Sequence, residues 1–268
     1  MASAIYALIN MVVSNMDYNR FTSKADLYDK FRPKYSEEFI DYIYKYLGIS
    51  DNTIVADIGA GTGILSEEFL KRGSSVICVE PNKKMLEQAK YKLQQFKKVA
   101  FINATAENTS IINSSVNIVT VGQAFHWFDK KAFLKECRRI LIENGFVVLA
   151  WNISDSNDSI NKEIANTNYM YCKKYNGYSS RDKEDDTEYL AFFTNNKMEI
   201  NIFENSLLLD KEGFVGRCLS RSYAPNSNDE EYQYYVDSLL KIFDIYSENK
   251  KIKIKNNTKC IIGKVKQW

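Results

Sequence analysis

Two acidic residues and a glycine-rich turn stand at points where strand-like runs of this sequence end. The stretch "VADIGAGTG" (55–63) places Asp57 two positions before Gly59, and Glu80 ends the next apolar run, "VICVE". Gly59 and Gly61 let the backbone turn tightly and approach a ligand without an intervening side chain. A carboxylate at Asp57 repels a pyrophosphate and suits a cationic amino-acid group, and one at Glu80 can accept hydrogen bonds from both hydroxyls of a ribose. The alternative for Glu80 is a solvated acid at a strand end, which the register of Asp57 and the glycines disfavours.

The glycine-rich turn differs from the fingerprint of nicotinamide dinucleotide sites. That fingerprint, G-x-G-x-x-G, needs a third glycine where this chain has Ile64. A nucleotide-binding protein of the dinucleotide type is therefore the weaker interpretation of the turn.

The stretch "VGQAFHWFD" (121–129) contains the only histidine of the chain, His126. Because imidazole titrates near neutral pH, His126 could be a base that removes a proton from an acceptor hydroxyl. The other interpretation is a wall or substrate contact, in which the ring stacks beside Phe125 and Trp127. Asp129 is the only acid within three residues of His126, and its position predicts the N-cap of the next helix. We favour the wall or contact over the base.

From about residue 53 to 151, short β-rich runs alternate with helical stretches. The predicted strands are 53–59, 74–80, 99–104, 116–124 and 145–151. The predicted helices between them are 64–72, 82–96 and 130–144, with Gly73 and Gly145 as helix stops. Nearly continuous apolar strands separated by helices indicate a parallel sheet covered on both faces, and right-handed crossovers make it a doubly wound α/β sheet. Ligands bind such sheets at the carboxyl ends of the strands.

The segments on both sides of this core also show helix and strand patterns. An amphipathic helix that docks on protein is expected in the first sixteen residues, and a second helix at 36–48, capped by Ser36 and ended by Gly48. After the core, the patterns predict helices at 157–176 and 229–247, a polar loop at 177–188, a β-like run at 198–209 and a terminal hairpin at 251–265.

The composition argues against several kinds of partner. A formal net charge of +2 with interspersed acids and bases does not suggest a protein that binds nucleic acid. Five widely spread cysteines and one histidine provide neither zinc-ligand spacing nor a disulfide framework, which predicts no metal and fits a reducing cytoplasm. The apolar N-terminus lacks the basic residues of a secretory signal and is too short to span a bilayer, so no membrane partner is expected. A homo-oligomer formed through the N-terminal helix stays an open alternative.

Together the motifs resemble the class I S-adenosylmethionine (SAM)-dependent methyltransferases. The resemblance rests on "DIGAGTG", "VEP", "NATAEN" (103–108) and "VGQAFHWFD", and covers about 53 to 151. The flanks "YDKFRPKYSEEFIDYI" (28–43) and "LSRSYAP" (219–225) resemble the small-molecule branch similar to trans-aconitate methyltransferase. The resemblance to class I methyltransferases implies a Rossmann-like, mostly parallel seven-stranded sheet with an N-terminal helical segment and a C-terminal antiparallel hairpin. The expected parts of this one domain are an N-terminal helical lid or cap (1–48), a SAM-binding core (49–152) and an acceptor cap with the rest of the sheet (153–268).

The resemblance also implies which residues bind the methionine and ribose parts of SAM. The backbone of Gly59, Ala60 and Gly61 would pass beside the methionine, with Asp57 near its ammonium group. Glu80 would hold the ribose hydroxyls. Gln123, at the end of the fourth strand, would face the methyl group.

A further set of residues would border the adenine or close over the cofactor. The residues expected beside the adenine are Pro81, Asn82, Thr105, Ala106 and Glu107. The family often has Asp at the position of Thr105, and here the backbone N–H of Ala106 could reach the ring instead. Tyr28 and Arg32 would close over SAM, or else be a structural tyrosine and a surface arginine.

The implied activity is transfer of the methyl group of SAM to a small molecule by in-line displacement, which leaves S-adenosylhomocysteine (SAH). A hydroxyl or carboxylate oxygen is the favoured acceptor atom. The candidate acceptor contacts are Phe125, Trp127, Arg221 and Tyr223. Arg221 could anchor an acidic acceptor bidentately or be a salt-bridged structural arginine. The alternatives are a SAM-binding protein without turnover and a methyltransferase acting on a macromolecule, and the near-neutral charge argues against the latter.

Overall fold

The structure is a computed structural model that describes residues 31–177 and 187–265. The chain divides into two compact units. The described residues of the first, the core unit, are 34–152, 187–204 and 258–265, and those of the second, the helical unit, are 31–33, 153–177 and 205–257. The predicted three-part division of one domain stays a prediction. The predicted N-terminal helix and Tyr28 lie outside the described residues.

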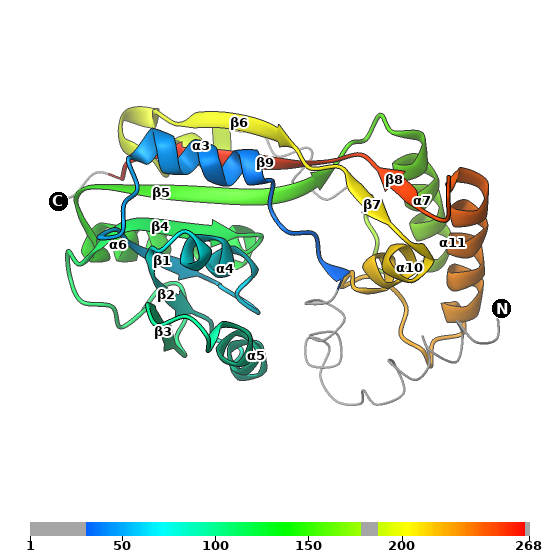
Figure 1. Cartoon of the computed structure of the whole chain (residues 1–268), viewed down its shortest axis with the longest axis horizontal. Helices are drawn as coiled ribbons and strands as arrows, with labels where there is room; N and C mark the ends of the chain where they lie inside the picture. The colour runs from blue at the N-terminus through cyan, green and yellow to red at the C-terminus, as the bar shows by residue number, and fades with distance from the viewer. Residues whose placement is uncertain (1–30, 178–186, 266–268) are drawn as a thin grey trace. The chain divides into compact units, whose positions relative to one another are not determined.

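The core unit is built on a seven-stranded sheet. Its strands are β1 (Ile54–Ile58), β2 (Ser75–Val79), β3 (Val99–Ile102), β4 (Val116–Gly122), β5 (Leu141–Ser154), β6 (Glu199–Glu204) and β9 (Asn256–Gly263). They lie in the order β3-β2-β1-β4-β5-β9-β6 (Figure 1). Of this sheet, only the last two residues of β5 and the first two of β9 are assigned to the helical unit. β1 pairs in parallel with β2 and β4, β2 with β3, and β4 with β5. The strand order therefore reverses between β1 and β4, and the predicted doubly wound, mostly parallel fold is confirmed.

The helices of the core unit are α3 (Glu37–Leu47), α4 (Ile64–Lys71), α5 (Lys83–Leu93), α6 (Lys130–Ile140) and α9 (Thr187–Leu190), with single 3₁₀ turns at η1 (Phe125–Trp127) and η2 (Thr194–Asn196). Of these, α4, α5 and α6 lie where the sequence predicts helices between strands, whereas α9 begins at Thr187, inside the predicted polar loop 177–188. Gly48 ends α3 in the left-handed conformation, as expected. Ser36 precedes α3, but its side chain makes no capping hydrogen bond, and its backbone N–H instead donates to Oγ1 of Thr258 at 3.1 Å. Ser36 is therefore the N-cap residue, as predicted, but it caps the helix without its side chain.

The apolar faces of α3 and α4 meet the sheet in one buried cluster. Phe39, Ile40 and Ile43 from α3 and Phe69 from α4 are fully buried there, together with residues of β1, β2 and β4. Each such side chain stabilises the fold by about 1.5–3 kcal/mol through removal of apolar surface from water. This packing fixes α4 behind the loop that follows β1.

The fifth strand begins earlier than the sequence suggests. The predicted helix 130–144 ends at Ile140, and Leu141 is already extended and paired with Val116 of β4. Gly145 is consequently not a helix stop. It lies inside β5 beside a shift in register, where a Cβ atom would come within 3.0 Å of the carbonyl oxygen of Asn117. Close approach of two backbones, which the sequence pattern does not reveal, is the reason for this glycine.

The helical unit has its own core. Its elements are α7 (Ser159–Tyr171), β7 (Leu207–Leu209), α10 (Lys211–Leu219), α11 (Tyr232–Tyr246) and β8 (Ile252–Ile254). Helices α7, α10 and α11 bury Ile164, Phe214, Tyr235 and Phe243 in one cluster. Across the described residues, no helix has the length and hydropathy that crossing a membrane requires.

The C-terminal antiparallel pairing is present, but its two strands come from distant segments. β8 pairs antiparallel with β7, with Leu207 opposite Ile254, whereas β9 lies between β5 and β6 in the larger sheet. The run 251–265 therefore contributes to two sheets instead of folding on itself. The predicted β-like run 198–209 is likewise split between β6 and β7. Both departures arise because the pairing partners of these strands are distant in sequence, and a local sequence pattern does not predict such partners.

Candidate functional site

The glycine-rich turn after β1 is tied to the end of β2. The backbone N–H groups of Gly59 and Ala60 donate to the carbonyl oxygen of Val79 at 2.8 and 3.0 Å. Gly59 has a φ of +69°, and a Cβ atom there would lie 2.7 Å from Cβ of Ala124. A side chain at this position would therefore both strain the backbone and displace the chain that leaves β4. The turn forms a cradle of bare backbone where β1, β2 and β4 end.

Glu80 is held in this cradle by hydrogen bonds from the backbone, and its role toward a ribose stays a prediction. Its carboxylate accepts hydrogen bonds from the backbone N–H of Gly61 and of Asn82, both at 2.9 Å, and the residue is 7% exposed. Burial raises the pKa of Glu80 above its usual value, and the hydrogen bonds from the two N–H groups offset part of this rise. Each carboxylate oxygen has a second lone pair for a ligand. Glu80 is thus a fixed acceptor at the strand end, not a solvated acid.

Asp57 is a more deeply enclosed acid, 1% exposed. It accepts from Oγ of Ser66 at 2.5 Å and from Oγ1 of Thr120 at 3.0 Å. Burial raises its pKa to about 6 in spite of these two hydroxyl donors. Because both oxygens already accept hydrogen bonds within the core unit, its predicted contact with the SAM ammonium stays a prediction.

The loops after β2 and β3 are joined by Asn103, which the sequence analysis did not single out. Nδ2 of Asn103 donates to the carbonyl oxygens of Glu80 and Pro81 at 2.8 and 2.9 Å. Asn82 caps α5 by accepting from the N–H groups of Lys84 and Met85. In the sequence, Asn103 is a polar residue directly after an apolar strand. Because this pattern is common in loops, it does not single out Asn103.

The predicted adenine-side residues lie on the loop that follows. Thr105 is exposed and Ala106 is buried. Glu107 accepts from the backbone N–H of Asp129 at 3.0 Å and so links this loop to the start of α6. The roles of all three toward adenine stay predictions.

Gln123 has the backbone conformation of a constrained position. Its φ is +62°, in the left-handed region that side chains other than glycine rarely adopt. Its N–H donates to the carbonyl oxygen of Ala150, and Nε2 donates to that of Asn152 at 3.4 Å. Such strain, about 1–3 kcal/mol, concentrates at functional positions. The end of β4 is therefore a constrained point of the core unit.

The single histidine lies on η1, three residues after Gln123. Its ring centroid is 4.9 Å from that of Trp127, whose side chain is 68% exposed. Phe125, on the same turn, is enclosed. It is 2% exposed and packs edge-on against Phe192 and Trp151, so in this structure it is a core residue, and its role as a substrate contact stays a prediction. Asp129 caps α6, as predicted, by accepting from the N–H groups of Lys131 and Ala132.

The remaining predicted acceptor contacts, Arg221 and Tyr223, belong to the helical unit and follow α10. The hydroxyl of Tyr223 accepts from Nδ2 of Asn168 on α7 at 3.4 Å. Arg32 belongs to the same unit. Across the described part of the chain, no group of three His, Cys, Asp or Glu side chains is arranged to hold a metal ion.

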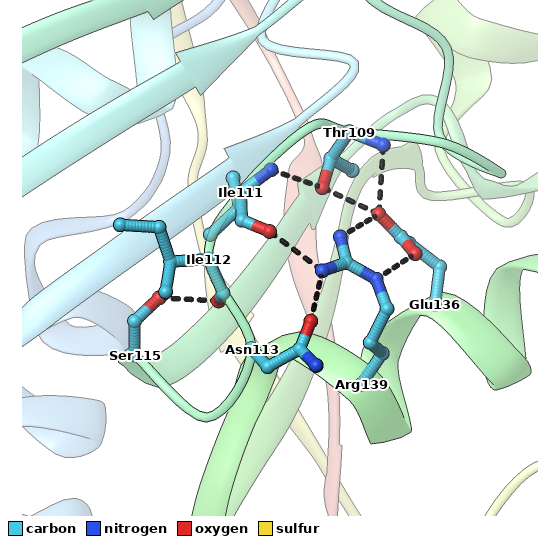
Figure 2. A network of polar contacts seen from close by, with 7 residues as sticks. All are labelled: Thr109, Ile111, Ile112, Asn113, Ser115, Glu136 and Arg139. Atoms are coloured by element: carbon cyan, nitrogen blue, oxygen red, sulfur yellow. Dashed lines mark hydrogen bonds and ion pairs between the residues drawn. The ribbon is translucent and has the colours of Figure 1, made fainter.

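A polar network fixes the loop between the "NATAEN" stretch and β4. Glu136 of α6 accepts from the N–H and Oγ1 of Thr109 at 2.7 and 2.6 Å, and from Nε and Nη2 of Arg139 at 2.8 and 2.7 Å (Figure 2). Nη1 of Arg139 donates to the carbonyl oxygen of Ile111 at 2.7 Å and to Oδ1 of Asn113 at 2.6 Å. Sequence reasoning missed this network because its partners are 27 residues apart.

Replacing Glu136 with Gln should destabilise the protein by about 1.5–3 kcal/mol. The donors of Thr109 and Arg139 now bind two carboxylate oxygens, and the amide of Gln has only one oxygen that can accept from them. Urea denaturation monitored by circular dichroism measures the change. Glu143→Gln, at an exposed position of β5, is the matched control and should leave the midpoint unchanged. Equal midpoints for the two variants would contradict the anchoring role of Glu136.

Comparison with known proteins agrees with the geometry of the core unit. Residues 56–149 match the family model described as a methyltransferase domain. An uncharacterized methyltransferase of Mycobacterium tuberculosis is 36% identical over 135 residues, covering 50% of this chain and 53% of that protein. An uncharacterized methyltransferase of Schizosaccharomyces pombe is 30% identical over 138 residues, covering 50% and 54%. The chain thus spans about half the length of these relatives.

Solved structures share the fold. A candidate type II methyltransferase from Anaeromyxobacter dehalogenans aligns with a TM-score of 0.67 at 16% identity, covering 89% of this chain and 100% of that one. The YcgJ protein from Bacillus subtilis aligns with a TM-score of 0.54 at 20% identity, covering 87% and 100%. Residues 56–149, which carry the glycine-rich turn and Glu80, therefore match a methyltransferase domain, and the sheet that contains them has the Rossmann-like fold of these solved structures.

Proposed function

We propose that this chain is a SAM-dependent methyltransferase that methylates a small molecule, with a hydroxyl or carboxylate oxygen as the acceptor atom. The observation that carries the proposal is Glu80, fixed by two backbone N–H groups at a strand end beside a turn that a Cβ atom would fill. The two carboxylate oxygens of Glu80 have lone pairs left to accept hydrogen bonds from the two hydroxyls of a ribose. The glycine-rich turn leaves room for the methionine part of SAM beside the backbone. A relative among the matches, 31% identical over 100 residues, is named ubiquinone biosynthesis O-methyltransferase, which supports an oxygen acceptor.

The work of this chain in such a reaction is positioning. SAM supplies an activated methyl group, so the protein must align the acceptor atom and exclude water. The Gly59–Gly61 turn and Glu80 would hold the cofactor, and Gln123, whose backbone is constrained, would face the methyl group. The interspersed charges support a small acceptor over a nucleic acid. The five cysteines are all free and buried, which supports a reducing, cytoplasmic setting. The flanking motifs support the branch resembling trans-aconitate methyltransferase.

Turnover tests this proposal. The purified chain is incubated with methyl-labelled SAM and, in separate reactions, with a panel of small acids, phenols and amines, with RNA and with protein, and label in each product is counted. We expect label to appear in at least one hydroxyl or carboxylate compound. Binding of SAM without any transfer across the panel would favour a SAM-binding protein, and transfer only to RNA or protein would contradict the small-molecule acceptor.

His126 can be tested once an acceptor is in hand. As a wall or contact residue, it should affect the acceptor KM in both His126→Asn and His126→Phe, while kcat changes little. The control is SAH affinity, which should stay at the wild-type value. A base would behave differently. Both variants would then lose about 10²-fold or more in kcat, and wild-type turnover would rise with pH through a step typical of imidazole.

A further inference from the structure

The helical unit contains a buried arginine with unused donors. Arg217 lies on α10 and is 3% exposed. Its Nε and Nη2 atoms are enclosed, and neither has a hydrogen-bond partner in residues 31–177 and 187–265. Buried polar groups are nearly always hydrogen-bonded, and a buried guanidinium is usually paired with an acid. Two orphaned donors on one buried cation therefore need an explanation.

Two of the described neighbours of Arg217, Arg221 and Arg32, are also cationic. Burial, together with the charges of Arg221 and Arg32, lowers the pKa of Arg217 to about 10, so the guanidinium stays charged at neutral pH. A fold has no stability reason to enclose one cation and bring others near it, because both burial and repulsion oppose this. Clustered like charges with perturbed pKa values are typical of binding sites.

The fold holds this cluster in place from several elements. A Cβ atom at Gly216 would lie 2.6–2.7 Å from ring carbons of Phe31, so the backbone of α10 touches the segment that carries Arg32. After α10 the chain makes a further turn, in which the N–H of Arg221 donates to the carbonyl oxygen of Cys218 at 3.3 Å. Packing thus brings Arg32, Arg217 and Arg221 together.

The two orphaned atoms also have the right geometry for one kind of ligand. Nε–H and the neighbouring Nη2–H of a guanidinium point in the same direction and form a fork that matches two oxygens of a carboxylate or phosphate. We propose that the helical unit binds a small oxyanion, a carboxylate or phosphate group, through Nε and Nη2 of Arg217, with Arg221 and Arg32 contributing positive charge. This proposal concerns a ligand of the helical unit and does not depend on the proposed methyl transfer.

Thermal unfolding with two probes, inorganic phosphate and succinate, tests the site. The buffer contains chloride as its only other small anion. At about 100 times Kd, the probe that binds should raise the Tm of the wild-type protein by about 5 °C. Which probe acts distinguishes a phosphate from a carboxylate ligand. A wild-type Tm that neither probe raises would overturn the proposal.

The variant Arg217→Met tests whether a probe-induced rise in Tm depends on this residue. Because the variant removes an unpaired buried charge and keeps the side-chain volume, its Tm without probe should equal or exceed that of the wild type. It should also lose the probe-induced shift. Lys211→Met, on the same helix and paired with Asp244 at 2.6 Å, is the matched control and should keep the shift. An unchanged shift in Arg217→Met, or a fall of its probe-free Tm of several degrees, would contradict the proposal.

Two further measurements distinguish a failure of the oxyanion proposal from a failure of the proposed methyltransferase function. Arg221→Gln, at a partly exposed position, should weaken binding of the active probe about tenfold, and wild-type affinity in this variant would count against the cluster. SAH binding, measured by calorimetry on Arg217→Met, reports on folding of the core unit and on the proposed function independently of the oxyanion.

Discussion

Replacing Glu80 with alanine should weaken SAH binding by about 1.5–3 kcal/mol, or roughly 10- to 150-fold in Kd. The carboxylate is already fixed by Gly61 and Asn82, so a ribose diol that binds there gains two charge-assisted hydrogen bonds without ordering a side chain. Isothermal titration calorimetry measures the change directly.

Two variants make the Glu80 experiment specific. Glu80→Gln keeps the shape but offers one acceptor oxygen in place of two, so its affinity should lie between those of the wild type and Glu80→Ala. Glu87→Ala removes an exposed acid of α5 and should bind SAH like the wild type. If Glu80→Ala bound SAH as tightly as Glu87→Ala, the assigned cofactor position would be wrong.

The largest pH effect is expected from Asp57. Burial raises its pKa from 3.8 to about 6 in the folded protein. A folded-state pKa above the unfolded-state value means that the folded protein holds the proton more tightly, so its contribution to stability is fully present below pH 4. That contribution declines as pH rises to about 6, by about 3 kcal/mol in all, and is constant above.

Asp57→Asn isolates this contribution from those of the other carboxyl groups. Urea unfolding of the two proteins is compared at half-unit steps from pH 4 to pH 7. The free energy of unfolding of the wild type, minus that of the variant, should fall by about 3 kcal/mol over this range. A difference that stays constant, or rises with pH, would show that Asp57 is ionised at low pH in the folded protein.

Local sequence signals were sufficient for the parts of the fold with local causes. The first four predicted strands and the turn at Gly59 follow from apolar runs and from glycines, and Asp129 caps α6 because its side chain reaches N–H groups two and three residues away. The position of Glu80 at the end of β2 follows from the same pattern.

Features that depend on partners distant in sequence could not be predicted in this way. Leu141 is extended because it pairs with Val116, Gly145 is needed because Asn117 lies close, and β7 pairs with β8 across more than forty residues. The same cause hid the Glu136 network and left Arg217 as one polar residue among several in the sequence. Its burial and its unused donors are visible only in the folded chain.

Titration of the wild-type protein with SAH and with NAD tests the central claim, that the cradle between Gly59 and Glu80 is a SAM site. SAH should bind with a stoichiometry of one, because it offers a ribose diol to Glu80 and an amino-acid group to the turn. NAD should give no heat of binding at the same concentrations, because its pyrophosphate would approach the carboxylate of Asp57 and the turn lacks the third glycine. Tight binding of NAD, or no binding of SAH to folded protein, would contradict the account.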